Sequence, residues 1–235
     1  MQEVEKVLGH EEVVKHLKNA AAMDKVSHSY IFAGEKGSGK KLLAKLFAMT
    51  LQCEKHGDEP CLQCSSCKKA MNRNHPDIIY ISHEKPNSIG IEDIREQLIS
   101  DVSIKPYTGP YKIYIVDEAE KMTVQAQNAL LKTIEEPPAY AVILLLVNNG
   151  STLLPTIASR CVTLNFKTVR DEVIKKYLME ELHVPDYQAE VSVAFAQGNV
   201  GKAKQIATAE DFTEMMDAAF RILKRGQDME VYEMV

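Results

Sequence analysis

The chain has 235 residues, of which 45% are hydrophobic and 26% are charged, so it can bury a core as one large domain or two smaller ones. Its 28 basic and 33 acidic residues give a formal net charge of −5, which argues against a protein that coats nucleic acid non-specifically. The longest apolar run, Ala141–Val147, is too short to cross a bilayer, and the acidic N-terminus is unlike a signal peptide. We therefore expect a soluble, cytoplasmic protein without a membrane partner.

Residues 1–167 are predicted to form a parallel α/β domain. The expected strands are apolar along their whole length, which indicates that both faces of the sheet are covered. Strands and helices also alternate along the chain, as they do in parallel sheets. In chain order, the expected elements are a helix over residues 11–23, a strand over 29–33, a helix over 40–52, a strand over 77–82, a helix over 91–100, a strand over 111–116, a helix over 123–135, a strand over 141–147, a short helix over 153–159 and a strand over 161–166.

After Lys167 the strand pattern stops, which predicts a domain boundary at this point. The rest of the chain has the period of amphipathic helices. The last predicted helix leads to an end without a clear stop signal, which is compatible with a fragment of a longer protein. The expected helices lie over residues 169–182, 187–196, 198–208 and 211–224.

A glycine-rich loop, Gly34-Glu-Lys-Gly-Ser-Gly39-Lys40, separates the first predicted strand from the next helix. In a phosphate loop, residues such as Gly34, Gly37, Ser38 and Gly39 direct backbone N–H groups at a phosphate, and the positive end of the helix adds to the attraction. Lys40 would then reach the outer phosphates of a nucleotide. A plain glycine-rich turn is the alternative, but the strand and helix on either side favour a phosphate loop.

Position 41 departs from this pattern. A working phosphate loop carries Ser or Thr after the lysine, because that hydroxyl coordinates Mg²⁺. Lys41 stands there instead, and an ammonium repels a nearby cation and cannot ligate it. We expect Lys41 to turn outward, nucleotide binding to be weak or absent, and hydrolysis to be crippled.

Two acids, Asp117 and Glu118, follow the predicted strand over 111–116. An aspartate at this place can hold magnesium through water, and the next glutamate can polarise an attacking water. The alternative is that both acids simply favour the start of the following helix. The apolar strand and the upstream loop favour a nucleotide site. Asn148, after the strand over 141–147, is equally compatible with sensing a γ-phosphate and with starting a turn.

Four cysteines, Cys53, Cys61, Cys64 and Cys67, are clustered in a chain with no export signal, which indicates metal binding instead of disulfides. The two-residue spacing lets neighbouring thiolates bind one ion, and four thiolates complete a tetrahedron, so we predict structural zinc. An iron–sulfur cluster and unligated thiols are the alternatives. The remainder of residues 53–75 is polar and loop-like with little core of its own, so metal binding should supply much of its folding energy.

Together these features resemble the AAA+ clamp-loader subunits of bacterial DNA polymerase III, most closely those of the delta-prime type, over essentially the whole chain. Besides the phosphate loop and the cysteines, the match rests on Asn74-His75-Pro76-Asp77, Val116-Asp117-Glu118-Ala119, the run over 128–138 and Ser159-Arg160-Cys161. The resemblance implies an AAA+ parallel-sheet domain over 1–167 with an inserted zinc module at about 53–75. It also implies a helical lid over 168–208 and the first helix of a truncated collar domain over 209–235.

In that family, a ring of subunits opens a sliding clamp and places it on primed DNA, using ATP. The arginine of the Ser-Arg-Cys segment is a finger given in trans to the neighbour's nucleotide, a role that the resemblance places on Arg160. A guanidinium is always charged and suits this role. The alternative is a surface arginine that neutralises a helix C-terminus. Cys161 is then expected to be a buried strand residue, not a metal ligand.

The departures from the family define the expected role. ATP-hydrolysing members carry Ser or Thr at the position of Lys41 and usually an arginine in the lid, where this chain has Gly201. The resemblance therefore implies a stator that is no competent ATPase by itself and that completes a neighbour's site. Its expected partners are the gamma/tau and delta subunits, and through the assembled complex the sliding clamp and primer-template DNA.

Two other functions stay open on the sequence. The first is an ATP-hydrolysing motor subunit of the gamma/tau type, which the presence of Asp117 and Glu118 supports. A zinc-bearing nucleic-acid binder acting alone is suggested by Lys68, Lys69 and Arg73, which directly follow the cysteines. No aromatic residue is interleaved with these basic residues, which disfavours that function.

Overall fold

The structure, a computed structural model, describes residues 7–210 together with residues 212, 214, 216, 218 and 221. The predicted helix over 211–224 and most of the segment assigned to 209–235 lie outside the described residues. The chain forms two compact units, Met1–Lys167 (unit 1) and Thr168–Val235 (unit 2). Each unit has its own core.

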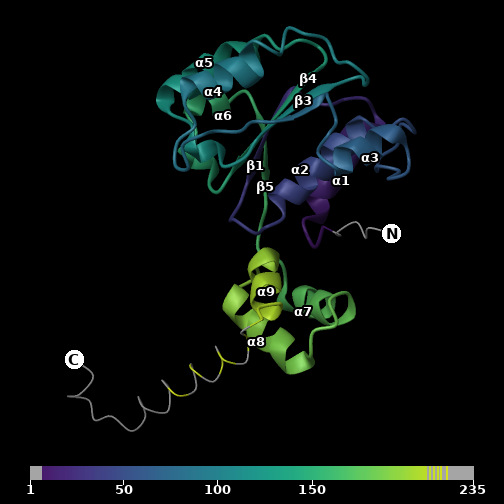
Figure 1. Cartoon of the computed structure of the whole chain (residues 1–235), viewed down its shortest axis with the longest axis vertical. Helices are drawn as coiled ribbons and strands as arrows, with labels where there is room; N and C mark the ends of the chain where they lie inside the picture. The colour runs from purple at the N-terminus through teal and green to yellow at the C-terminus, as the bar shows by residue number, and fades with distance from the viewer. Residues whose placement is uncertain are drawn as a thin grey trace, which may run out of the picture. The chain divides into compact units, whose positions relative to one another are not determined.

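Unit 1 contains a five-stranded parallel sheet in the order β2-β3-β4-β1-β5, which confirms the expected parallel α/β fold (Figure 1). Its central strand β4 pairs with β1 and β3. In the register, Ser29 lies opposite Ile143, and Lys112 lies opposite Ala141. The strands are β1 (Ser29–Ala33), β2 (Ile78–Tyr80), β3 (Lys112–Val116), β4 (Ala141–Val147) and β5 (Val162–Asn165).

Helices cover both faces of this sheet, as the unbroken apolar strands require. In Figure 1, α1, α2 and α3 lie on one side of the strands and α4, α5 and α6 on the other. The helices of unit 1 are α1 (Glu11–Ala22), α2 (Lys40–Leu51), α3 (Ser65–Met71), α4 (Ile91–Ile94), which continues into a π-helical turn η1 (Arg95–Ile99), α5 (Val124–Glu135) and α6 (Pro155–Ala158). Two 3₁₀ turns, η2 (Ala119–Lys121) and η3 (Gly150–Thr152), follow β3 and β4.

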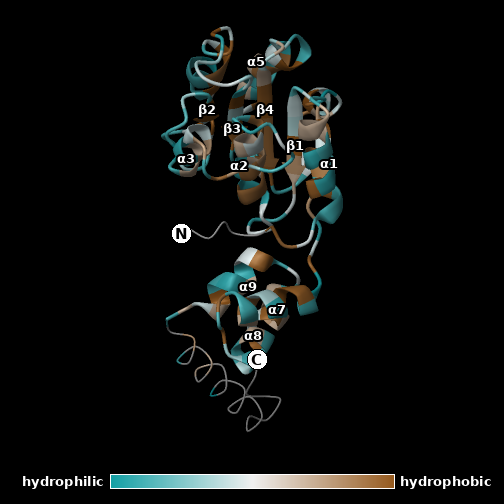
Figure 2. Ribbon diagram, turned by 90° about the vertical axis from the view of Figure 1, so that its right-hand side faces the viewer, coloured by the Kyte–Doolittle hydropathy of each residue, from teal (hydrophilic) through white to brown (hydrophobic). Residues whose placement is uncertain are grey.

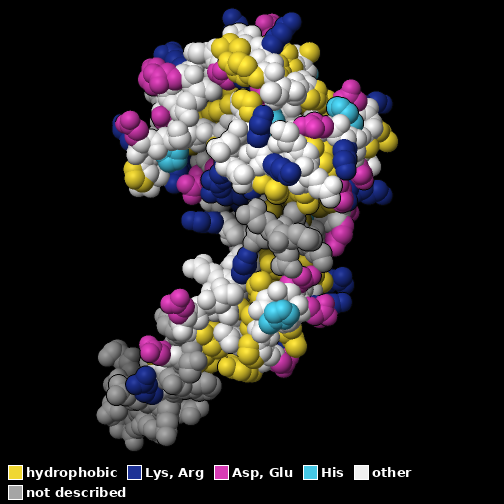
Figure 3. Space-filling model, turned by 45° about the vertical axis from the view of Figure 1, so that its right-hand side comes forward, with side chains coloured by type: hydrophobic (Ala, Val, Ile, Leu, Met, Phe, Trp, Pro, Cys, Tyr) yellow, Lys and Arg dark blue, Asp and Glu magenta, His cyan; other side chains and the backbone are white. Residues whose placement is uncertain are grey.

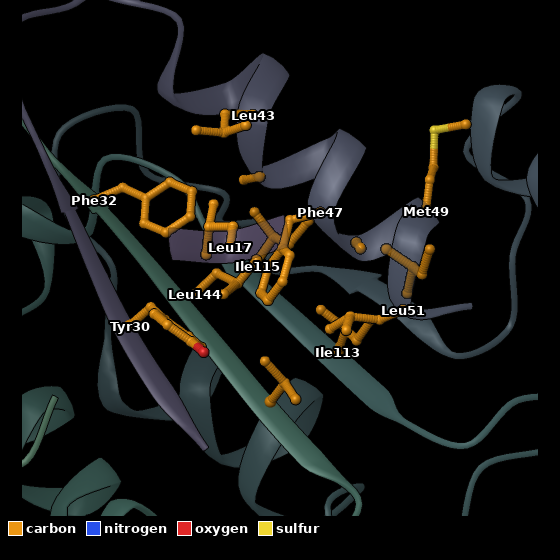
Figure 4. Close-up of a cluster of buried hydrophobic side chains, with 14 of the residues drawn as sticks. Leu17, Tyr30, Phe32, Leu43, Phe47, Met49, Leu51, Ile113, Ile115 and Leu144 are labelled. Carbon is orange, nitrogen blue, oxygen red and sulfur yellow. The ribbon is translucent and has the colours of Figure 1, made fainter. Parts of the chain in front are cut away.

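Alternate strand residues supply two separate cores, one on each face of the sheet. Tyr30, Phe32 and Leu144 point to the face covered by α1, α2 and α3, where they pack with Phe47 (Figure 4). Their strand neighbours, such as Ile31 and Leu145, pack on the opposite face under α4, α5 and α6. The central strand β4 is accordingly hydrophobic along its whole length (Figure 2). Full burial of side chains of this size contributes about 1.5–3 kcal/mol each.

The expectation that residues 53–75 are loop-like is wrong in part, although the segment has no core separate from that of the sheet. Helix α3 forms there, and Cys53, Cys67 and Ala70 are buried in the same core as α2. The helix is short and mostly polar, so its sequence has little amphipathic signal. It is specified by its start, where the sulfur of Cys64 accepts a hydrogen bond from the N–H of Cys67, and by packing on α2.

Unit 2 consists of α7 (Asp171–Glu180), α8 (Asp186–Ala196) and α9 (Val200–Ala207) among its described residues. Ile174, Leu178, Ala189 and Ala203 are fully buried in its core. Helix α9 begins where the Asn199 side chain accepts a hydrogen bond from the N–H of Lys202 at 3.0 Å. None of the helices in the described part of the chain has the length and apolar character needed to cross a bilayer.

Candidate functional site

The glycine-rich loop over residues 34–39 joins the end of β1 to the start of α2. At Gly34, a Cβ would lie 2.6 Å from the Cβ of Phe166 and 2.8 Å from its carbonyl oxygen, so no larger residue fits. Gly39 has a φ of +96°, which favours glycine. The loop therefore enters α2 directly at Lys40, and the unpaired N–H groups of the first helical turn lie at the loop.

Lys40 is buried, with 8% of its surface exposed. Its Nζ donates hydrogen bonds to the carbonyl oxygens of Gly34 and, at 2.8 Å, of Glu35. Burial lowers the pKa of Lys40, and the nearby carboxylates of Glu120 and Asp117 oppose this shift. The predicted contact of Lys40 with a phosphate would therefore require the ammonium to exchange loop carbonyls for phosphate oxygens.

Lys41 is largely exposed, and its ammonium also pairs with an acid, a contact that the sequence did not predict. Its Nζ forms an ion pair with the Asp117 carboxylate, which follows β3. The Lys41 side chain is 69% exposed and that of Asp117 31% exposed, so solvent reaches this ion pair. The residue that replaces the hydroxyl of a working loop thus neutralises the acid that would hold a metal.

The other two acids after β3 also have internal partners. Glu118, in a left-handed backbone conformation with φ +50°, pairs with Lys121 at 2.6 Å. The hydrogen bond from Lys121 lowers the pKa of Glu118. Asn148, after β4, donates its side-chain amide to Glu120. Sequence reasoning missed Glu120 and Lys121, because their roles depend on the 3₁₀ turn η2 and not on a motif.

Arg160 lies at the edge of the sheet opposite to the loop. It precedes β5, whereas the loop follows the neighbouring strand β1, and these two strands are parallel. Four paired residues at about 3.3 Å each separate the two edges by roughly 13 Å. Arg160 therefore lies away from the loop of its own chain.

Besides a hydrogen bond to the neighbouring Ser159 hydroxyl at 3.3 Å, two contacts hold the Arg160 side chain, which is 40% exposed. It pairs with Glu135 at 2.9 Å and donates to the carbonyl oxygen of Thr156 in α6, also at 2.9 Å. The contact with Thr156 lies at the C-terminus of α6, as expected of a surface arginine that neutralises a helix C-terminus. Cys161 is half-buried and lies just before β5, so it is not the buried strand residue that was expected; burial raises the pKa of its thiol to about 11.

The structure brings the four clustered cysteines together. The sulfurs of Cys53, Cys61, Cys64 and Cys67 all lie within 4.8 Å of one another. Zn–S bonds of about 2.3 Å in a tetrahedron place sulfurs about 3.8 Å apart, so the group fits a single zinc ion. The four thiolates of an iron–sulfur cluster are divided among two or more iron atoms, so those on different irons need wider spacing.

Backbone N–H groups surround these sulfurs. The N–H of Cys61 donates to the sulfur of Cys53, and that of Cys64 donates to the sulfur of Cys61, both at 3.4 Å. Hydrogen bonds from the backbone of Gln63 and Cys64 lower the pKa of Cys61 to about 6, whereas burial raises the pKa of Cys67. Such donors stabilise thiolates, the form that binds a metal.

A hydrogen-bonded chain connects the cysteine module to the sheet. The Ser66 hydroxyl donates to the carbonyl oxygen of Gln52 at 2.6 Å and contacts the His75 ring at 3.1 Å. The other ring nitrogen of His75 accepts the N–H of Asp77 at 3.2 Å. The Asp77 carboxylate, fully buried before β2, accepts three backbone N–H groups and one hydroxyl from residues 107–109. The role of Asp77 could not be predicted, because its partners are about thirty residues away in the sequence.

The charged surface shows mixed signs. On the face of Figure 3, lysine and arginine side chains lie interspersed with acidic ones. A protein that binds nucleic acid by itself gathers basic residues on one face. This face therefore does not favour a zinc-bearing protein that binds nucleic acid by itself.

Comparisons with known proteins point to one family. The family model described as "DNA polymerase III, delta subunit" matches residues 9–170. DNA polymerase III subunit tau of Bacillus subtilis is 35% identical over 92% of this chain and 40% of its own length. Subunit delta' of the same organism is 34% identical over 86% of this chain and 60% of its own length. The chain thus spans 40% and 60% of the length of these two relatives, and tau and delta' match it about equally well.

Two solved structures share the fold. A DNA polymerase III gamma subunit-related protein from Thermotoga maritima has a TM-score of 0.52 and 25% identity, over 87% of this chain and 61% of that one. A single-residue variant of Thermotoga maritima RuvB has a TM-score of 0.56 over 85% of this chain and 61% of that one. At 18% identity, RuvB supports the fold alone. Both likenesses agree with the expected AAA+ type of α/β fold.

Proposed function

This chain belongs to the family described as DNA polymerase III, delta subunit, and we propose that it is a clamp-loader subunit that acts as a non-hydrolysing stator of the delta-prime type. In this role the sheet domain supports its neighbours in a ring that loads a sliding clamp on primed DNA. The chain supplies Arg160 in trans to the nucleotide of an adjacent ATPase subunit. Its own phosphate loop binds ATP weakly or not at all.

The observation that carries this proposal is the ion pair between Lys41 and Asp117. Hydrolysis by this class of loop needs a hydroxyl after the lysine and an acid that holds Mg²⁺. Lys41 removes the hydroxyl and also neutralises the acid. Both requirements are lost through one residue, which supports a subunit that does not hydrolyse ATP in cis.

The position of Arg160 supports a role in trans. It lies at the amino edge of the parallel strands, roughly 13 Å from the edge that carries the phosphate loop of its own chain. A finger at that place meets a phosphate only on another molecule. Its pair with Glu135 is half-exposed, so the pair contributes little stability and can be exchanged for a phosphate at low cost.

The proposed function also includes partners, a zinc site and a helical lid. The proposed partners are the gamma/tau and delta subunits and, through the assembled complex, the clamp and primer-template DNA, in the cytoplasm. The four-cysteine group is proposed to hold structural zinc, since no ligand position is left for water. The helices of unit 2 are proposed to form the lid, with Gly201 where motor subunits usually have an arginine.

The alternative is an ATP-hydrolysing motor subunit of the gamma/tau type. The match to subunit tau over 92% of this chain favours it, as does the retention of Asp117 and Glu118. Nucleotide affinity separates the two functions. Micromolar ATP binding that Mg²⁺ strengthens supports the motor, whereas weak binding that is indifferent to Mg²⁺ supports the stator.

Reconstitution with candidate motor subunits tests the proposed function. Arg160→Ala should leave this chain folded and lower the ATP turnover of the assembled complex by at least tenfold, because a finger in trans contributes large factors to turnover. The matched control is Arg95→Ala, which removes another exposed, ion-paired arginine. Turnover that is the same in both variants and in the wild type would contradict the finger.

A further inference from the structure

The end of β3 is a dense cluster of opposite charges. Asp117, Glu118 and Glu120 lie within four residues, and each has a partner from the same chain. Asp117 pairs with Lys41, Glu118 with Lys121, and Glu120 accepts the Asn148 amide. Acids gathered in this way without cations would repel one another.

Lys41 differs from the other two partners in where it comes from. Lys121 is three residues from Glu118, so their pair is local, and Asn148 is uncharged. Lys41 is the first-turn residue of α2 and reaches across from the phosphate loop to the end of β3. It is therefore a cation that connects the two elements which a bound Mg²⁺ connects in working sites of this class.

We propose that the Lys41 ammonium is a built-in replacement for the divalent cation at the end of β3. It holds the start of α2 to β3 without Mg²⁺ and excludes the metal by its charge. This inference rests on the proposed function, because it explains how the subunit keeps its own loop out of hydrolysis. Lys41 is a positioning residue here, since it acts on the junction and on no substrate.

This proposal predicts a response to Mg²⁺ alone. Without the ammonium, Asp117 loses its partner beside two further carboxylates, and hard oxygen ligands of this kind suit Mg²⁺. Lys41→Thr also restores a hydroxyl at the position after Lys40. The variant should therefore accept Mg²⁺ in place of the lost ammonium, whereas the wild type should not.

The experiment compares thermal unfolding of the full chain in metal-depleted buffer with and without millimolar Mg²⁺. No chelator is used, because it would also remove zinc from the cysteine group. The variants are Lys41→Thr and the double variant Lys41→Thr/Asp117→Asn. Lys176→Thr is the matched control, since Lys176 is a similarly exposed lysine that faces Glu180 at 3.9 Å, far from β3 in the sequence.

We expect the wild type and Lys176→Thr to unfold at temperatures that Mg²⁺ shifts equally and only slightly. Lys41→Thr should unfold roughly 1–3 °C below the wild type without Mg²⁺, the shift of an exposed ion pair in a chain of this size. Millimolar Mg²⁺ should restore at least half of that loss. The double variant should not respond, because it lacks the acid that Lys41 neutralised.

Binding of Mn²⁺, followed by its electron paramagnetic resonance signal, is a second readout that does not depend on stability. Mn²⁺ should bind Lys41→Thr at least tenfold more tightly than it binds the wild type. Equal Mg²⁺ shifts and equal Mn²⁺ affinities in these two proteins would overturn the proposal. Neither ATP nor another subunit is present, so this failure would leave the Arg160 experiment untouched, and the reverse also holds.

Discussion

The sharpest test of how the fold is held together is Asp77→Asn, a substitution that keeps the shape of the side chain. Asp77 is fully buried, and one carboxylate oxygen accepts the N–H of Tyr107 at 2.7 Å. The other accepts the N–H and hydroxyl of Thr108 at 2.8 and 2.9 Å and the N–H of Gly109 at 3.3 Å. Asparagine has a single side-chain oxygen, so it can accept hydrogen bonds either from Tyr107 or from Thr108 and Gly109, but not from both.

The expected cost follows from these contacts. With the amide oxygen facing Thr108, the amide nitrogen faces the N–H of Tyr107, so one hydrogen bond is lost and two donors meet. The three remaining bonds fall from charge-assisted to neutral strength, which is about half. Hydrogen bonds to charged groups contribute roughly 1.5–3 kcal/mol each, so one lost bond and three bonds at about half strength add up to an expected loss of roughly 4–7 kcal/mol.

The loss should also depend on pH in one direction. Burial raises the pKa of Asp77, but the donors from Tyr107, Thr108 and Gly109 outweigh burial, so the pKa lies below its ordinary value. A carboxyl group with a lowered folded-state pKa stabilises the fold above its unfolded pKa of about 3.9, and this contribution disappears as the pH falls through the folded value. The difference between wild type and variant should therefore be complete at neutral pH and shrink below about pH 4.

Urea unfolding followed by circular dichroism measures this difference, since the chain has no tryptophan to report by fluorescence. Asp186→Asn is the matched control, because Asp186 is 64% exposed and its pair with Lys175 should contribute less than about 1 kcal/mol. If Asp77→Asn destabilises the chain no more than Asp186→Asn does, the hydrogen bonds of Asp77 do not hold residues 107–109. A difference that persists unchanged into acid would refute the reasoning from its charge.

Two further predictions concern the cysteine module and the loop. Cys64→Ser should release a bound metal and expose residues 53–75 to protease while the sheet stays folded, which zinc stoichiometry and limited proteolysis measure; retained stoichiometric zinc would contradict a four-thiolate site. Gly34→Ala should destabilise unit 1 by about 1–3 kcal/mol, because the new Cβ would collide with Phe166, and an unchanged urea midpoint would show that the loop can move away.

The sheet could be predicted from sequence because each strand carries its own signal. The strands Ser29–Ala33 and Ala141–Val147 are unbroken apolar runs, and the structure places both at the predicted bounds. Helix α5 was predicted to within one residue, since Thr123 caps its start and prolines follow its end. These signals are local, so they can be recognised in the sequence without knowledge of the tertiary structure.

Features that depend on distant partners could not be predicted in this way. Helix α3 exists because Cys67 and Ala70 pack on α2, although its own sequence is mostly polar. Lys41 was recognised as a departure, but its pair with Asp117 depends on how α2 and β3 meet. The sequence therefore indicates which residue types are unusual, and tertiary contacts decide what those residues do.

The parallel sheet is also compatible with the proposed stator, which would lack hydrolysis and keep a function toward its neighbour. Lys41, Asp117 and Asn148 all lie at the carboxyl edge of the strands, where β1, β3 and β4 end. Arg160 lies at the amino edge, before β5, with the buried strands between the two. Contacts at one edge can therefore change without repacking the other, since sites this far apart without shared partners act almost independently. Under the proposed function, a lysine in place of the metal-binding hydroxyl at position 41 thus carries no structural penalty for Arg160 at the other edge.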